Sequence, residues 1–190
     1  MLVLGILGSP RKGGNSELLL SAFLQGAKEA GGEIKIIRVA EKNIFPCIEC
    51  GKCEEKGLCP IPDDMQEAYT LLKKADLIVL ATPVFFCGVT AQLKAFIDRC
   101  QTLWIQRYVL NIKDEKQHFG FLLTVGASKN KNLFVGVELT AKCFFTSIGA
   151  EYKGMLGFKK IETKGDIKHH PTALKKALLK GRKLIKEITC

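Results

Sequence analysis

The sequence predicts an α/β fold built on a doubly wound sheet of five parallel strands. Apolar runs of strand length alternate along the chain with segments whose apolar residues recur at helical spacing. The strand-length runs are nearly continuous, which is typical of strands covered on both faces. Strands that alternate with helices are joined by crossover connections and therefore lie parallel. A chain of 190 residues with this apolar content fits one domain, residues 1–190.

The first strand is expected at 2–7, where the sequence is Leu-Val-Leu-Gly-Ile-Leu. A loop of turn-forming residues follows over 8–16. Apolar residues then recur at helical spacing over 18–27, and Asn15 or Ser16 is the expected N-cap. This stretch is a strand, a glycine-rich loop and a helix in succession.

The remaining elements continue the same alternation. Strands are expected at 34–39, 77–81, 119–125 and 155–158, and helices around 65–72, 91–103, 133–148 and 172–188. The apolar pattern is weak over 104–117, so an irregular excursion is expected there.

Four cysteines occupy a loop over 43–62 that follows the second strand. The spacing is Cys47-x-x-Cys50-x-x-Cys53, and Cys59-Pro60 lies shortly beyond it. Closely spaced thiolates select soft metals, and a C-x2-C-x2-C run is typical of cubane ligands in bacterial ferredoxins. Structural zinc sites usually use two pairs separated by a longer loop. The spacing therefore favours a [4Fe–4S] cluster, with zinc and unligated thiols as the alternatives.

Disulfides are a further reading of the same cysteines, and they form in oxidising compartments. The apolar start of the chain is too short to span a bilayer and has no basic residue before it. We therefore expect a cytoplasmic protein without membrane insertion. Of the other cysteines, Cys100 and Cys143 fall in expected helices and are interpreted as core residues.

Three loops are expected to line one site, because ligands of parallel sheets bind beyond the carboxyl ends of the strands. The first loop carries Ser9, Arg11 and Ser16 and opens a helix, which suits an anion. The loop after the third strand carries Phe85 and Phe86, which could border a planar ring. The loop after the fourth strand begins at 126.

Two further motifs frame the cysteines. They are Gly8-Ser9-Pro10-Arg11 through Gly14-Asn15-Ser16, and Ala81-Thr82-Pro83-Val84-Phe85 through Leu93-Lys94-Ala95-Phe96-Ile97-Asp98-Arg99. Together they resemble the flavodoxin-like NADPH-dependent FMN reductase superfamily. With the four cysteines between them, the resemblance is closer to the iron–sulfur flavoprotein branch. It extends over about the first 130 residues.

The resemblance implies two cofactors, FMN and a [4Fe–4S] cluster held by the four cysteines. It assigns the FMN phosphate to Ser9, Arg11, Asn15 and Ser16. It places the isoalloxazine between a border of Pro83, Val84, Phe85 and Phe86 and a far side formed by Gly126, Ala127 and Ser128. Members usually carry Tyr where this chain has Phe85. The resemblance also implies a homodimer or homotetramer.

The implied function is that of an electron-transfer oxidoreductase. A one-electron donor such as ferredoxin would reduce the cluster, and electrons would pass through FMN to a small acceptor such as dioxygen, hydrogen peroxide or a quinone. One alternative is an NAD(P)H-dependent FMN or quinone reductase whose cysteines are structural or bind zinc. Another is a non-catalytic redox sensor. No acid–base residue is identifiable, and the role of Cys87, near the flavin loop, stays open.

The formal net charge of +10 is concentrated near the end of the chain. Residues 159–190 hold ten Lys and Arg against three acidic residues. A solvated helix face explains such a run, and it also suits docking of an acidic redox protein. Nucleic acid is not expected as a partner, because no recognised module is present and the chain has one Trp and three Tyr for stacking.

Overall fold

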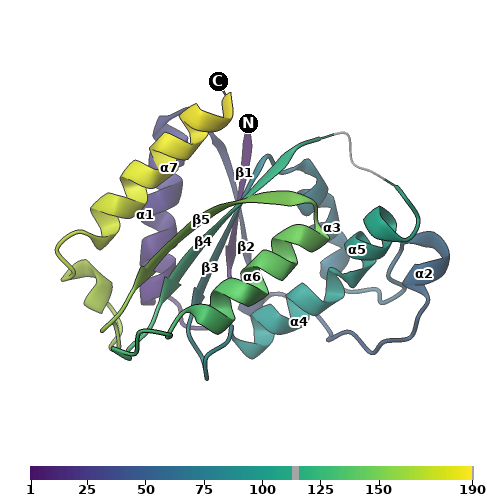
Figure 1. Ribbon diagram of the computed structural model, residues 1–190, viewed down its shortest axis with the longest axis horizontal. Helices are drawn as coiled ribbons and strands as arrows, with labels where there is room; N and C mark the ends of the chain where they lie inside the picture. Colours follow the sequence, from purple (N-terminus) through teal and green to yellow (C-terminus); the bar gives the residue numbers. More distant parts are fainter. Residues whose placement is uncertain (113–115, 190) are drawn as a thin grey trace.

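The computed structural model describes residues 1–112 and 116–189 and confirms the predicted α/β class. Five parallel strands form one sheet in the order β2-β1-β3-β4-β5, with helices on both faces (Figure 1). Their bounds are Leu2–Leu7 (β1), Glu33–Arg38 (β2), Leu77–Pro83 (β3), His118–Val125 (β4) and Ala150–Phe158 (β5). This is the flavodoxin-like order, in which the chain reverses direction across the sheet between β1 and β3.

Helices α1 (Asn15–Glu29) and α7 (Ala173–Thr189) cover one face of the sheet (Figure 1). Their apolar sides bury Phe23 and Ala177 against strand residues such as Phe121. The two helix backbones approach closely: a Cβ added at Gly26 would lie 1.9 Å from the carbonyl oxygen of Leu178. The predicted basic helix is therefore an integral layer of the fold.

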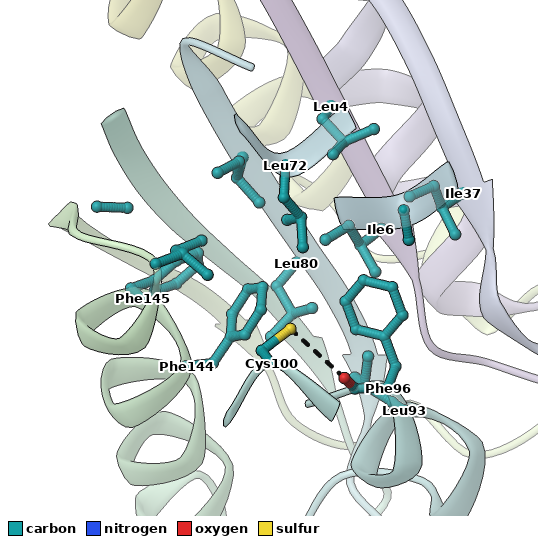
Figure 2. Packing of buried hydrophobic residues seen from close by; sticks show 14 of the residues in the cluster. Leu4, Ile6, Ile37, Leu72, Leu80, Leu93, Phe96, Cys100, Phe144 and Phe145 are labelled. Carbon is teal, nitrogen blue, oxygen red and sulfur yellow. Dashed lines mark hydrogen bonds between the residues drawn. The ribbon is translucent and has the colours of Figure 1, made fainter. Parts of the chain in front are cut away.

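Helices α3 (Met65–Lys74), α4 (Ala91–Arg99), α5 (Gln101–Tyr108) and α6 (Val135–Ser147) lie on the other face. Figure 2 shows Phe96, Cys100 and Phe144 packed against Ile6 and Leu80 of the sheet. The Cys100 thiol lies 3.5 Å from the Phe96 carbonyl oxygen, and burial raises the pKa of that thiol. Cys100 is thus an inert core residue, as predicted.

Part of the predicted irregular excursion over 104–117 is helical, so that prediction was wrong. The expected single helix breaks at Cys100, and α5 continues to Tyr108 because Leu103 and Ile105 pack into the core. Tertiary packing often supports a helix whose local pattern is weak. Residues 113–115 of the excursion lie outside the described residues.

Three other details differ from expectation. β5 begins at Ala150, because an edge strand with mostly half-buried residues lacks a continuous apolar run. The N-cap of α1 is Gly14, which makes no side-chain cap. Cys143 is exposed on α6, whose buried side is formed by other residues, so it is not a core thiol. Cys190 lies outside the described residues.

Short elements complete the chain. They are the 3₁₀ turns η1 (Val39–Glu41) and η2 (Asp166–Lys168) and the helix α2 (Cys53–Lys56), which lies in the cysteine loop. Among the residues that the structure describes, no helix has the length and apolar character that crossing a bilayer requires.

Candidate functional site: two neighbouring cavities

A cavity of about 300 Å³ opens at the carboxyl ends of β1, β3 and β4, and we call it the flavin cavity. Nine of the eleven residues predicted to bind FMN line it. They are Ser9, Arg11, Asn15, Ser16, Pro83, Val84, Phe85, Gly126 and Ala127, and the other lining residues are Pro10, Gly14, Val125, Ile161 and Glu162. The sheet thus brings the three predicted loops together.

The first loop is fixed to the neighbouring strand and to α4. The Gly8 N–H donates to the Ala81 carbonyl oxygen over 2.8 Å. The buried Thr90 hydroxyl donates to the Gly8 carbonyl oxygen, and it accepts a hydrogen bond from the Leu93 N–H as the N-cap of α4. These contacts give the loop after β1 a defined position.

One end of the flavin cavity is suited to a phosphate. The first N–H groups of α1 lack partners within the helix, and no side chain caps them. The charge of Glu17, in the first turn of α1, is compensated: its carboxylate pairs with Arg38 at 2.6 Å and accepts from the Gly13 N–H at 2.7 Å. The bond to Arg38 lowers the pKa of Glu17. An anion beside Ser9 and Ser16 would therefore meet uncapped N–H groups and the positive end of the helix dipole.

The Asn15 side chain organises a segment that the sequence did not place at the site. Its Nδ2 donates to the Thr163 carbonyl oxygen at 2.7 Å. Its Oδ1 accepts from the Gly165 and Ile167 N–H groups at 3.0 and 3.2 Å. This anchoring carries 161–162 to the wall of the cavity. The predicted contact between Asn15 and a phosphate stays a prediction.

The other end of the flavin cavity is largely apolar. The Val84 N–H donates to the Val125 carbonyl oxygen at 2.9 Å, which aligns the loops after β3 and β4. Phe85 lines the cavity and is 49% exposed. This wall of proline, valine and phenylalanine side chains fits one face of a flat aromatic ring.

Two residues of the predicted FMN set, Phe86 and Ser128, do not line the cavity. Phe86 and Cys87 form the tip of a two-residue turn closed by mutual hydrogen bonds between Phe85 and Gly88 at 2.9 Å. Both tip residues have positive φ, 46° and 63°, and the Phe86 side chain is fully exposed. Ser128 is also exposed, and its hydroxyl accepts from the Asn130 N–H at 3.0 Å. The turn geometry directs Phe86 into solvent.

All four cysteines of the 43–62 loop line a second cavity, of about 420 Å³, which we call the cysteine cavity. Cys47 and Cys50 are exposed, and Cys53 and Cys59 are partly buried. Burial, followed by the three neighbouring thiols, raises the pKa of Cys53. The end of α4 and the start of α5 complete the wall. The four predicted ligands therefore line one cavity, and their binding of a cluster stays a prediction.

Side chains from outside the loop hold it in place. The Gly57 carbonyl oxygen accepts from the Thr102 hydroxyl at 2.7 Å and also from the Gln106 amide. The Gln66 amide donates to the Cys59 and Ile61 carbonyl oxygens at 3.0 and 2.8 Å. The second half of the loop is therefore ordered by the protein itself.

A buried ion pair fixes the two ends of the loop. Arg99 and Asp63 approach to 2.6 Å, and their side chains are 1% and 0% exposed. Asp63 also accepts from the Phe45 and Met65 N–H groups at 2.9 and 3.0 Å. Burial by itself would raise the pKa of Asp63, but the hydrogen bond to Arg99 and those backbone bonds outweigh it and lower the pKa. The pair was not recognised from the sequence, because its members are far apart in the chain.

Comparison with known proteins identifies the family of the chain. Residues 1–133 match the family model described as NADPH-dependent FMN reductase. The chain belongs to that family. Its relatives include iron–sulfur flavoproteins of Methanocaldococcus jannaschii and Methanosarcina thermophila, which are 44% and 40% identical over 130 residues. The aligned part is 68% of this chain and a little under two thirds of each relative, 64% and 65%. The resemblance inferred from the motifs is confirmed.

Solved structures of similar fold extend over nearly the whole chain. An NAD(P)H:quinone oxidoreductase from Methanothermobacter marburgensis has a TM-score of 0.71 at 19% identity and covers 97% of this chain and 96% of its own. A flavone reductase has the same TM-score at 18% identity and covers all of this chain and 63% of its own. At these identities the likeness establishes the fold alone.

The residues present fit the cofactors that the family implies. In the flavin cavity, phosphate-binding groups at one end and an apolar wall at the other match the two ends of FMN. In the cysteine cavity, four thiols surround a space large enough for a polynuclear centre. Among residues 1–112 and 116–189, no three His, Cys, Asp or Glu side chains lie close enough to hold one metal ion.

Proposed function

We propose that this family member is an iron–sulfur flavoprotein, an oxidoreductase that passes electrons from a one-electron donor such as ferredoxin to a small acceptor. The acceptor classes are dioxygen, hydrogen peroxide and quinones. The observation that carries the proposal is that four cysteines line one cavity, while a second cavity has uncapped helix N–H groups at one end and an apolar wall at the other. When bound, a [4Fe–4S] cluster would carry single electrons and FMN would exchange one or two.

Helix α4 connects the two cavities. Its N-cap, Thr90, contacts the first flavin loop, and its last residues, Asp98 and Arg99, line the cysteine cavity. Nine residues at 1.5 Å each make the helix about 13 Å long. The cavities share no lining residue. The chain thus holds the two sites at a set separation, and each can be altered without touching the other.

The structure bears on where a donor would approach. The basic helix α7 packs with α1 on one face of the sheet, whereas the cysteine loop contacts α4 and α5 on the other face (Figure 1). A protein docked on α7 would stand away from the cysteines. Ferredoxin as the donor is therefore supported by the cysteine chemistry and not by the basic tail.

We also propose that copies of the chain assemble into a homodimer or homotetramer that covers the cysteine loop. Three large apolar side chains of the loop are exposed: Phe45 by 54%, Ile48 by 70% and Leu58 by 64%. Exposed apolar groups gathered in one segment mark interaction surfaces. Sedimentation of the purified protein tests this proposal. We expect Ile48→Lys to shift the protein toward monomers, and a monomeric wild type would contradict assembly.

The second candidate is an NAD(P)H-dependent FMN or quinone reductase with structural or zinc-binding cysteines. The family description favours it. Anaerobic stopped-flow reduction separates the candidates. Under the leading proposal, reduced ferredoxin bleaches the flavin of the wild type, and Cys59→Ser slows this step strongly. Fast bleaching by NADPH that Cys59→Ser leaves unchanged would favour the second candidate. Turnover with any acceptor counts against the third reading, a redox sensor.

A further inference from the structure

Arg99 is a charged residue buried in the wall of the cysteine cavity. It is the last residue of α4, is 2% exposed and lines the same cavity as the four cysteines. Its Nη1 donates to Asp63 Oδ2 at 2.6 Å and to the Phe45 carbonyl oxygen at 2.9 Å, and its Nη2 donates to Asp63 Oδ1 at 3.1 Å. Its Nε is buried and has no hydrogen-bond partner in the described part of the chain. One donor therefore stays unused.

The ion pair presents its positive end to the cysteines. Arg99 lines the cavity, whereas Asp63 does not. Burial by itself would lower the pKa of Arg99, but its bonds to Asp63 and its attraction to nearby groups, Cys59 among them, raise the pKa above the ordinary value. Arg99 is therefore a permanent cation, and burial weakens the solvent screening between its charge and the cavity.

A fixed cation at this place would affect a cluster in a predictable direction. When a cysteine-bound cluster accepts an electron from its donor, the donor loses one electron and the cluster becomes more negative by one charge, with no bond made or broken. Nearby charges and hydrogen bonds to the sulfurs set the potential of such clusters. Residues behind the ligands also orient them.

We propose that Arg99 is a positioning residue for the cluster, which holds both ends of the cysteine loop through Asp63 and raises the reduction potential of the cluster with its buried charge and free Nε–H. This proposal rests on the proposed function. The cation, its carboxylate partner and the spare donor are all parts of the fold itself.

The test is a redox titration of anaerobically purified protein, followed by electron paramagnetic resonance, with iron, sulfide and FMN measured on each sample. The variant is Arg99→Gln with Asp63→Asn, which removes the pair without leaving one charge buried alone. We expect FMN content to be unchanged. At a fixed potential, the ratio of reduced to oxidised cluster should fall about tenfold, which is a shift of about 59 mV for one electron. Lys183→Gln removes an exposed cation from α7, which lies on the other face of the sheet, and should leave the ratio unchanged.

A second variant, Arg99→Lys, keeps the cation but loses the planar fork and the Nε–H. We expect its potential to lie between those of the wild type and the double variant. A double variant with wild-type iron and an unchanged ratio would overturn the proposal. If the double variant loses iron but keeps FMN, the positioning role is supported, and a wild-type potential in Arg99→Lys would then overturn the contribution assigned to the Nε–H. Wild-type protein without iron and sulfide would mean that the proposed function itself has failed.

Discussion

The flavin cavity and the cysteine cavity differ in how the chain builds them. The flavin cavity is formed by loops that leave three parallel strands, so the hydrogen bonds of the sheet place its walls. The cysteine loop is an exposed insertion between β2 and α3, and a few side chains hold it, chief among them Arg99 and Asp63. The first site depends on the topology of the fold, and the second depends on individual anchors. Substitutions should therefore affect the two sites separately.

The largest expected effect follows the loss of a cysteine. Cys59→Ser should remove most of the iron, because a hydroxyl is a poor ligand for a soft metal centre. FMN should stay bound, because no residue lines both cavities. Iron and FMN assays on anaerobic protein measure both quantities. The matched control is Cys143→Ser, which alters an exposed thiol on α6 outside the cysteine cavity. Equal iron in the two variants would refute the assignment of ligands.

Removal of one partner of the buried pair should be the next largest effect. Asp63→Asn leaves the Arg99 charge buried without its carboxylate, which costs about 3–5 kcal/mol of unfolding free energy. Urea denaturation measures the loss. The control, Asp98→Asn, breaks an exposed pair with Lys94 and should cost less than about 1 kcal/mol. Similar losses in the two variants would mean that the loop does not depend on the pair.

The stability that Asp63 provides should also depend on pH. Its pKa in the folded protein is lowered below the ordinary value of 3.8. A carboxylate of this kind stabilises the fold fully above its unfolded pKa, and the contribution is lost as the pH falls through the folded pKa. The difference in stability between the wild type and Asp63→Asn should be constant near neutrality and shrink below about pH 4. A stability difference that grows as the pH falls would contradict this prediction.

A negative charge introduced at the phosphate end of the flavin cavity should weaken FMN binding and leave the iron content unchanged. Ser16→Asp places a carboxylate at the start of α1, where it would repel a phosphate and compete for the same N–H groups. We expect an affinity for FMN at least tenfold lower, or about 1.4 kcal/mol, by fluorescence titration. Ser21→Asp adds the same charge on an exposed position of α1 and should have little effect. Iron content should not change in either variant.

The smallest expected effects on FMN affinity distinguish Phe85 from its neighbour Phe86. Phe85→Ala should weaken FMN binding by about 0.5–1.5 kcal/mol, because Phe85 lines the flavin cavity. Phe86→Asn should leave the affinity unchanged and stabilise the protein slightly, because Asn tolerates the positive φ better than Phe. A marked loss of FMN affinity in Phe86→Asn would show that the turn closes over the bound ring.

The sequence predicted that most residues of the flavin cavity share one site, because the signals are local: apolar runs end in turn residues at each strand. It missed Ile161 and Glu162, which Asn15 brings to the cavity by hydrogen bonds to residues about 150 positions away. It also did not reveal that Phe86 points into solvent, because the tip of its turn has no Gly or Asn to indicate positive φ.

The sequence indicates which cysteines line the cysteine cavity, but it does not indicate which residues anchor their loop. The spacing of the cysteines follows from ligand chemistry. By contrast, the pairing of Asp63 with Arg99 depends on tertiary structure, because the two residues are 36 positions apart in the chain. Arg99 belongs to a family motif that says nothing about burial. Contacts between distant segments therefore account for what the sequence did not reveal.

The most direct test of the two-cofactor account is anaerobic purification followed by measurement of iron, sulfide and FMN, with a visible absorption spectrum. The account predicts about four iron, four sulfide and one FMN per chain, the stoichiometry of one cysteine-bound cubane beside one flavin. FMN without iron or sulfide, with zinc in their place, would contradict it and favour the NAD(P)H-dependent reductase.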